Sequence, residues 1–230
     1  MKSLAIKTST RVLNKYFYSK YIAHVVFNVD AYPYSHRNCQ NWDFTTLLLK
    51  KSLDMFVQDN QHILEIGTGH LAILSIYIAK RKKLNITAVD INPEFIKNAI
   101  INVEKNGVSI NLKQSDLFSN IAGTFDIIYF NPPYVPREWI FKNNKELYSN
   151  SIFDLTWDGG SDGCKTIRKF LEDVKCFIHK DSKILLGVNS IFVNTYKMSM
   201  LIAQAGLMLD SIISSRCNPS KVYVIKINDV

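Results

Sequence analysis

From residue 61 onward, short runs rich in β-branched and aromatic residues alternate with amphipathic stretches of helical periodicity. This alternation predicts βαβ units and a mostly parallel sheet. Only residues 216–220 join the last two strand-like runs, which is too short for a crossover helix, so we expect an antiparallel hairpin there. The sequence therefore predicts an α/β fold with a seven-stranded, mostly parallel sheet. The predicted strands are His62–Ile66, Ile86–Asp90, Ser109–Leu112, Phe125–Phe130, Lys183–Val188, Leu209–Ser215 and Val222–Ile227.

Proline and glycine delimit the predicted helices. Pro93 falls in a first helical turn, where its missing N–H costs nothing, and Gly107 and Gly206 follow helix ends, where a left-handed residue is favoured. The predicted helices are Leu71–Arg81, Pro93–Asn106, Cys164–Ile178 and Asn194–Gln204. Upstream we expect a helix over residues 3–20, a strand over Tyr21–Val29 and a helix over Asp43–Val57.

Composition bounds the class of protein. A chain of 230 residues with 47% hydrophobic residues can bury one sizeable core. We expect one catalytic domain, residues 41–230, preceded by an N-terminal extension, residues 1–40. No apolar run is long enough to span a membrane, and the four cysteines form no CxxC pair, so we expect a cytoplasmic protein with reduced thiols and no bound metal.

The net charge of +8 would suit a nucleic acid or an acidic protein as partner. The dense basic run at 80–83 falls at a predicted helix end, where cations interact well with the helix dipole. We therefore interpret most of the charge as solvated helix surface.

A glycine turn follows the first predicted strand. Gly67, Thr68 and Gly69 lie between that strand and a helix, where glycines let the backbone approach a ligand. Such a turn serves several cofactors. Glu65 narrows the choice, because its carboxylate would repel a pyrophosphate but suits a ligand that carries ammonium and sulfonium groups. Asp90 ends the next strand about twenty residues later, the separation at which an acidic side chain reaches a ribose, and Ile91 follows it.

The most specific motif follows the predicted strand Phe125–Phe130. It comprises Asn131, Pro132, Pro133 and Tyr134. Two prolines fix the backbone and withhold N–H donors, so the Asn131 side-chain oxygen and the Pro132 carbonyl can accept both hydrogens of one NH₂ group. The Tyr134 ring can stack on the planar group that bears this nitrogen. Holding a poorly nucleophilic amide or aromatic amine in this way aims its lone pair at an electrophile.

These motifs together resemble those of HemK-like methyltransferases that depend on S-adenosylmethionine (SAM). The E-x-G-x-G form of residues 65–69 resembles their first motif, the S-D-L-F of residues 115–118 resembles their G-D-L-F, and Gly159–Gly163 resembles their G-G-x-[DN]-G loop. The resemblance implies a class I, Rossmann-like sheet of order 3-2-1-4-5-7-6 with strand 7 antiparallel. It also implies S-adenosylhomocysteine (SAH) as product. The cofactor-binding residues it implies are Glu65, Gly67, Thr68, Gly69, Asp90, Ile91, Asp116, Leu117, Asn131 and Thr45, and the catalytic ones are Asn131, Pro132, Pro133 and Tyr134.

Three positions depart from the family pattern. Leu71 replaces the third glycine, Ser115 replaces the glycine before Asp116, and Phe44 stands where an acidic residue is expected before Thr45. Asp90 and Asp116 would also suit caps of helices or turns, and the Thr45 segment would equally suit a buried helix start. These departures leave open a SAM-binding interaction module without catalysis.

The resemblance implies methylation of a glutamine side-chain amide in a protein, as in translation release factors or a ribosomal protein. The bacterial members of the family carry a longer N-terminal helical domain, and the archaeal and eukaryotic members are short. The four-residue motif also occurs in enzymes that methylate adenine N6 or guanine N2, so an RNA or DNA amino-methyltransferase is the alternative. The sequence predicts neither the oligomeric state nor the individual acceptor.

Overall fold

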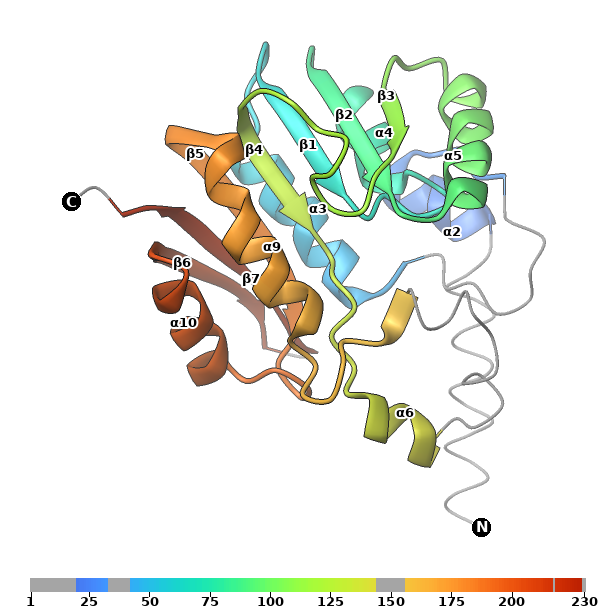
Figure 1. The fold of residues 1–230 in the computed structure, drawn as a ribbon. Coiled ribbons are helices and arrows are strands. Elements are labelled where there is room, and N and C mark those ends of the chain that lie inside the picture. The colour runs from blue at the N-terminus through green and yellow to red at the C-terminus, as the bar shows by residue number, and fades with distance from the viewer. Residues whose placement is uncertain (1–19, 33–41, 144–155, 217, 229–230) are drawn as a thin grey trace.

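One seven-stranded sheet organises the computed structural model, which describes residues 20–32, 42–143, 156–216 and 218–228. Its strand order is β3-β2-β1-β4-β5-β7-β6 (Figure 1). Strands β1 to β5 run parallel, and β7 pairs antiparallel with both β5 and β6. The predicted sheet, its order and its terminal hairpin are confirmed. The strands are β1 His62–Ile66, β2 Asn85–Asp90, β3 Asn111–Gln114, β4 Phe125–Phe130, β5 Ile178–Asn189, β6 Leu207–Ser215 and β7 Asn218–Ile227.

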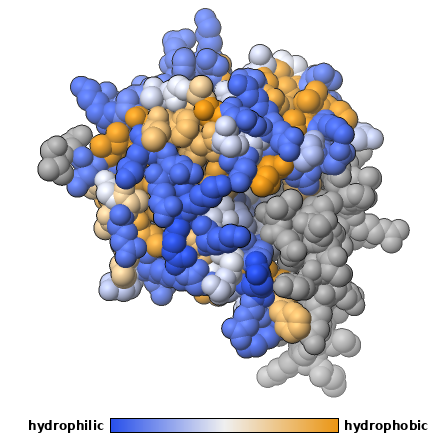
Figure 2. Space-filling model, in the orientation of Figure 1, coloured by the Kyte–Doolittle hydropathy of each residue, from blue (hydrophilic) through white to orange (hydrophobic). Residues whose placement is uncertain are grey.

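Two apolar cores lie on opposite faces of the sheet. Alternate residues of β1 divide between them: Leu64 packs in the core under α9 and α10, and Ile63 packs in the core under α2, α3, α4 and α5. Helices thus cover both faces of the sheet (Figure 1), as expected for a parallel sheet. The outer surface of α9 is charged and appears as a hydrophilic band across Figure 2.

Residues at the helix ends explain where several helices begin and end. α3 begins after Asp43, whose carboxylate accepts a hydrogen bond from the Thr46 amide, and Pro93 opens α5. Gly107 and Gly206 have φ of 64° and 72°, as predicted for the residues that follow helices. The helices are α2 Lys20–Phe27, α3 Phe44–Phe56, α4 Ile73–Ala79, α5 Pro93–Lys105, α6 Arg137–Asn143, α9 Lys165–Asp173 with a 3₁₀ turn Val174–Phe177, and α10 Thr195–Gln204.

The predicted strand over Tyr21–Val29 is wrong, because this segment forms α2. Its β-branched and aromatic residues favour a strand locally. Tertiary packing decides otherwise: Ala23 and Phe27, four residues apart, are both buried, and the Phe27 ring meets Trp42 and Tyr77 edge-on. Asn28, with φ of 54°, ends the helix.

The third strand lies two residues later than predicted, at Asn111–Gln114 in place of Ser109–Leu112. It is an edge strand with no fully buried side chain, so no apolar alternation sets its register. Its pairing with β2 does so instead, from Thr87 opposite Asn111 to Asp90 opposite Gln114. The short helix α6 was not predicted. The helix expected over residues 3–20 lies outside the described residues apart from its last position.

Within the described residues no helix is long and apolar enough to cross a membrane. The division at residue 41 into an extension and a catalytic domain stays a prediction. The described part of the proposed extension packs on the sheet domain, where the Tyr32 carbonyl accepts hydrogen bonds from the side chains of Asn98 and Asn102, each at 3.1 Å.

Candidate active site

A cavity of about 660 Å³ opens at the carboxyl ends of the parallel strands. A hollow of about 140 Å³ adjoins it and shares Gly67, Thr68, Gly69, Asn131 and Pro133 with it. Open α/β sheets bind their ligands at this edge. Of the residues predicted for the site, the cavity is lined by Gly67, Thr68, Gly69, Asp90, Ile91, Asp116, Leu117, Asn131 and Pro133, and the hollow adds Glu65, Pro132 and Tyr134.

Thr45 is the one predicted site residue that lines neither space. It is fully buried behind Tyr134, and its hydroxyl lies 3.2 Å from the Tyr134 hydroxyl and 3.0 Å from the Ser220 hydroxyl. Its position supports the Tyr134 side chain from behind.

The glycine turn is built from left-handed residues. Gly67 and Gly69 each have φ of 66°, and a Cβ on Gly67 would lie 2.9 Å from the Phe130 ring. Leu71, which replaces the third glycine of the family motif, is buried, and the following Ala72 adopts φ of 48° immediately before α4. The turn thus forms with Leu71 in place of the third glycine, and α4 begins at Ile73, two residues later than predicted.

Glu65 is buried and lines the hollow. Its Oε2 accepts hydrogen bonds from Thr68 Oγ1 at 2.6 Å and from Ser75 Oγ at 2.5 Å. Ser75 also lies 2.8 Å from the Tyr129 hydroxyl, so the carboxylate is held by a small buried network. Burial raises the pKa of Glu65 because desolvation penalises the charged form.

Asp90 is buried at the end of β2. Its Oδ2 accepts from the Gly69 amide and its Oδ1 from the Asn92 amide, both at 2.9 Å. Burial raises the pKa of Asp90 to about 6. Each carboxylate oxygen can accept a further hydrogen bond from a ligand hydroxyl.

Asp116 and Leu117 also line the cavity. The exposed Asp116 carboxylate lies 2.9 Å from Lys169 Nζ of α9, which lines the same cavity. Leu117 adopts φ of 49°, and its carbonyl accepts a hydrogen bond from Ser115 Oγ at 2.8 Å. The serine that replaces the family glycine thus stabilises this turn.

Asn131 and Tyr134 converge on a carboxylate that the sequence analysis missed. Asn131 Nδ2 donates to Asp43 Oδ1 at 3.3 Å, and the Tyr134 hydroxyl donates to Asp43 Oδ2 at 3.0 Å. Burial and the nearby Asp43 carboxylate raise the pKa of Tyr134 well above its usual value. Among the buried side-chain polar atoms of the described residues, Asn131 Oδ1 alone has no hydrogen-bond partner. An acceptor is therefore left free at this point of the site.

The glycine-rich loop packs directly on the backbone of the four-residue motif. The Val135 amide donates to the Trp157 carbonyl at 3.1 Å, and the Gly159 amide donates to the Val135 carbonyl at 2.9 Å. A Cβ on Gly163 would lie only 2.6 Å from the Tyr134 carbonyl oxygen. Glycine is needed at this position because the two backbones touch.

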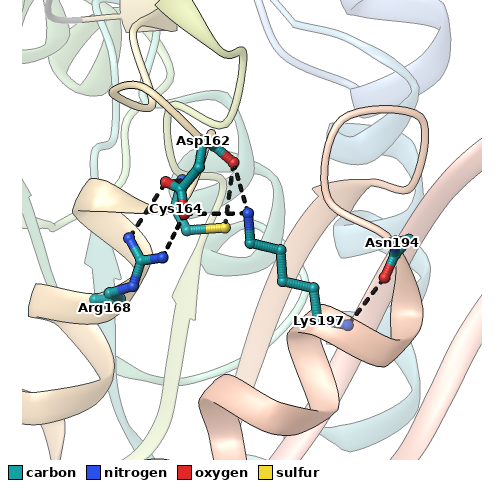
Figure 3. A network of polar contacts seen from close by, with 5 residues as sticks. All are labelled: Asp162, Cys164, Arg168, Asn194 and Lys197. Atoms are coloured by element: carbon teal, nitrogen blue, oxygen red, sulfur yellow. Dashed lines mark hydrogen bonds and ion pairs between the residues drawn. The ribbon is translucent and has the colours of Figure 1, made fainter.

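A polar network anchors the same loop to two helices. Figure 3 shows Arg168 of α9 and Lys197 of α10 approaching Asp162 from opposite sides. Lys197 Nζ lies 3.1 Å from the Asp162 carboxylate, and Arg168 binds both carboxylate oxygens. The Arg168 guanidinium holds the pKa of Asp162 well below its usual range. The loop therefore has a fixed position relative to both helices.

The sequence matches the methyltransferase small domain family over residues 32–153, more than half of the chain. The chain belongs to this family. It is 35% identical over 145 residues to a protein of Methanocaldococcus jannaschii that is provisionally named a protein N5-glutamine methyltransferase, covering 63% of this chain and 68% of that protein. It is 31% identical to the release factor glutamine methyltransferase of Streptococcus pneumoniae, over 63% of this chain and 51% of the relative. The chain spans about half the length of this bacterial relative.

Solved structures share the methyltransferase fold. A methyltransferase from Pyrococcus furiosus has a TM-score of 0.68 at 20% identity and covers 97% of this chain and 99% of its own. The Thermus thermophilus 16S rRNA N2 G1207 methyltransferase, in complex with AdoMet and guanosine, has a TM-score of 0.61 at 16% identity. The match covers 84% of this chain and 45% of that protein. The family match and the relative of 35% identity show a SAM-dependent methyltransferase, and the solved structures show that it has the class I fold.

The donor set of the cavity fits SAM. Glu65 and Asp90 are buried carboxylates, and neither forms an ion pair with a lysine or arginine of the described residues. The hydrogen bonds that both carboxylates accept offset the cost of their burial only in part, since burial still raises the pKa of each, and a positive charge and further donors would stabilise the ionised forms. A ligand that carries a sulfonium, an ammonium and two ribose hydroxyls supplies both. No cluster of metal-ligating side chains occurs in the described part of the chain.

Proposed function

We propose that this methyltransferase methylates the side-chain amide nitrogen of a glutamine in a protein, of the release-factor or ribosomal-protein type. The observation that carries the proposal is the buried Asn131 Oδ1 without a partner at the end of β4. An unsatisfied buried acceptor is costly, and an NH₂ group from a substrate would satisfy it. The names of the archaeal and bacterial relatives support glutamine as the bearer of that group.

In this proposal each predicted site residue has a role. Asn131 Oδ1 and the Pro132 carbonyl accept the two hydrogens of the amide, Pro133 fixes the backbone, and the Tyr134 ring packs on the amide plane. When bound, SAM supplies an electrophilic methyl group on its sulfonium. The amide nitrogen gains the methyl group and loses one proton, and SAH is released. The residues proposed to hold the cofactor are Glu65, Gly67, Thr68, Gly69, Asp90, Ile91, Asp116, Leu117 and Asn131, with Thr45 behind them.

Transfer of labelled methyl from SAM to a purified release factor with a Gly-Gly-Gln loop tests this function. We expect label in the intact factor and none in a factor whose loop glutamine is changed to alanine. Asn131→Ala should lower kcat by roughly 10²–10³-fold, the usual effect of removing one preorganised polar contact to the reacting group. Asn111→Ala is the matched control, because Asn111 is exposed on the edge strand β3. Absence of transfer to every Gly-Gly-Gln protein and to every ribosomal protein would refute the proposal.

The second candidate is a nucleic-acid amino-methyltransferase. The net charge of +8 and the cavity-lining Lys165 and Lys169 favour it. Lys169 is paired with Asp116, and Arg137 of the cavity is paired with Asp158, which reduces the free positive charge at the mouth. Incubation of a cell extract with labelled SAM, followed by separate protease and nuclease digestion, distinguishes the two candidates. Label that only nucleases release would favour the nucleic acid, whereas we expect label that proteases release.

A further inference from the structure

The Asn131 amide can present two different faces to a substrate. Its oxygen and nitrogen ends have nearly the same shape, so rotation of the amide by half a turn would replace an acceptor by a donor. Only the orientation with Oδ1 free can accept a hydrogen from an NH₂ group. A contact that fixes the amide orientation therefore decides whether the site can hold such a substrate.

Asp43 provides this contact. Its Oδ1 lies 3.3 Å from Asn131 Nδ2. An ionised carboxylate is an acceptor only, so it can pair with the NH₂ end of Asn131 and not with the oxygen. In the rotated amide two oxygens would face each other in a partly buried site, and the donor would lose its partner.

The same carboxylate also holds Tyr134 and is itself firmly held. Asp43 Oδ2 accepts from the Tyr134 hydroxyl at 3.0 Å, while Oδ1 accepts from the Thr46 amide at 2.8 Å and from the Thr46 hydroxyl at 2.9 Å. The bond from the Thr46 amide and the return bond from the Asp43 amide to the Thr46 hydroxyl, at 3.2 Å, form the capping box of α3, whose Leu49 and Leu53 are completely buried. Asp43 is thus held at the start of α3, and it in turn holds the side chains of Asn131 and Tyr134.

We propose that Asp43 is a positioning residue of this methyltransferase, which selects the acceptor orientation of Asn131 and fixes the Tyr134 ring. The proposal rests on the proposed function only for the identity of the methyl acceptor. The family pattern has an acidic residue at the position that Phe44 occupies in this chain. Asp43 lies one position earlier, and in our proposal it supports the active site.

Two substitutions separate this role from helix capping. Asp43→Ser keeps a good N-cap for α3, but its side chain is one atom shorter and ends before Asn131 and Tyr134. Asp43→Asn keeps the cap and the length of the side chain. The Thr46 amide, which donates to the same oxygen as Asn131 does, holds the new amide oxygen toward Asn131 and leaves the NH₂ group to donate to the Tyr134 hydroxyl. Asp54→Ser is the control on the same helix, because Asp54 bonds Tyr77 at 2.7 Å and lies away from the site.

We expect Asp43→Ser to lower kcat on the release factor roughly 10–100-fold, with the Kd for SAM and the melting temperature nearly unchanged. Asp43→Asn should restore kcat to within about fivefold of the parent, since positioning depends on geometry. Asp54→Ser should lower the melting temperature and leave kcat unchanged. Unchanged kcat in Asp43→Ser, or Asp43→Asn as slow as Asp43→Ser, would overturn the proposal.

A measurement without any acceptor keeps this inference distinct from the proposed function. The side-chain amide signals of Asn131 in a ¹H–¹⁵N NMR spectrum can be assigned by their loss in Asn131→Asp. We expect them to shift in Asp43→Ser and to return close to their original position in Asp43→Asn. If they do so while neither a Gly-Gly-Gln protein nor a ribosomal protein is methylated, the proposed substrate is wrong and the positioning role stands. If they do not move in Asp43→Ser, the positioning role is wrong whatever the substrate.

Discussion

Two buried carboxylates without a cationic partner determine the chemistry of the cavity. Burial raises the pKa of both Glu65 and Asp90. For Asp90 the folded-state pKa of about 6 exceeds the ordinary 3.8. Protonation of Asp90 therefore stabilises the free protein; this contribution is fully present below pH 3.8 and is lost as the pH rises through 6. A cationic cofactor reverses the preference, because it favours the ionised carboxylates.

Binding of SAM should therefore weaken as the pH falls through 6. At pH 5, one unit below the pKa of free Asp90, its protonation should cost roughly tenfold in affinity compared with pH 7.5. Glu65 adds to this effect in the same direction. Calorimetric titration of SAM at both pH values measures the change. Asp90→Asn should bind SAM more weakly at pH 7.5 and show a flatter pH dependence; a steeper one would contradict this account.

The sequence predicted most of the individual site residues because they follow strand ends, where their spacing along the chain fixes their place in space. Gly67, Asp90 and Asn131 all come to the same edge of the sheet for this reason. Asp43 could not be found in this way. It lies on a helix start some 88 residues before Asn131, and its contact depends on how α3 packs across the sheet. A carboxylate next to an expected acidic position was the only signal in the sequence.

At the scale of elements, the contact between the glycine-rich loop and the four-residue motif predicts a sharp effect of one added methyl group. Gly163→Ala places a Cβ against the Tyr134 carbonyl oxygen and must displace one of the two loops. We expect kcat for methyl transfer to the acceptor protein to fall at least about tenfold, since small displacements of groups that position a substrate cost that much. A steady-state methyl-transfer assay measures this loss.

Gly107→Ala is the matched control for backbone strain. Gly163 and Gly107 have φ of 76° and 64°, so alanine at either position should cost about 1–2 kcal/mol of stability. Around Gly107, however, the space for a Cβ is open. Equal losses of activity in the two variants would show that strain, and not the contact with Tyr134, is responsible.

The ion pairs of Asp162 should matter more for the position of the loop than for stability. The Asp162 and Arg168 side chains are 35% and 43% exposed, and exposed pairs contribute about 0–1 kcal/mol. We expect Asp162→Asn to lower the free energy of unfolding by no more than this in urea at pH 7, and by less at high salt. Because the folded-state pKa of Asp162 is depressed, its contribution is present above pH 3.8 and is lost as the pH falls further. A loss well above this range would show that the network is a main source of stability.

Prediction of the elements succeeded where burial produces a clear pattern. β1 and β4 are almost entirely buried, and their apolar runs were placed correctly. The edge strand β3 has no such pattern and was misplaced by two residues. In α2 the local preference for a strand lost to packing against α4, because Ala23 and Phe27 bury the same face of a helix. The misassigned elements are those whose structure depends on contacts distant in the sequence.

At the scale of the whole molecule, the cavity is lined by segments that are distant in the sequence and that the sheet brings together. Residues 67–71 follow β1, Asp90 ends β2, Asn131 follows β4, and Lys165 and Lys169 belong to α9. The alternation of strands and helices predicted the sheet and its hairpin, but the order of the strands came only from the family resemblance. Periodicity along a chain does not say which strands are neighbours.

Because SAM would contact segments from both halves of the sheet, its binding should stabilise the whole fold. At a free concentration near one hundred times Kd, the stabilisation is about 2.7 kcal/mol, which corresponds to roughly 5–10 °C in Tm for a domain of this size. Thermal unfolding of the chain with and without SAM or SAH measures the shift. Glu65→Gln and Asp90→Asn should show smaller shifts at the same SAM concentration, and Asn111→Ala should show the full one. If neither SAM nor SAH moved Tm at saturating concentrations, the cavity would not be the cofactor site. If both moved Tm equally in the parent and in Asp90→Asn, the ligand would bind without the contact to Asp90.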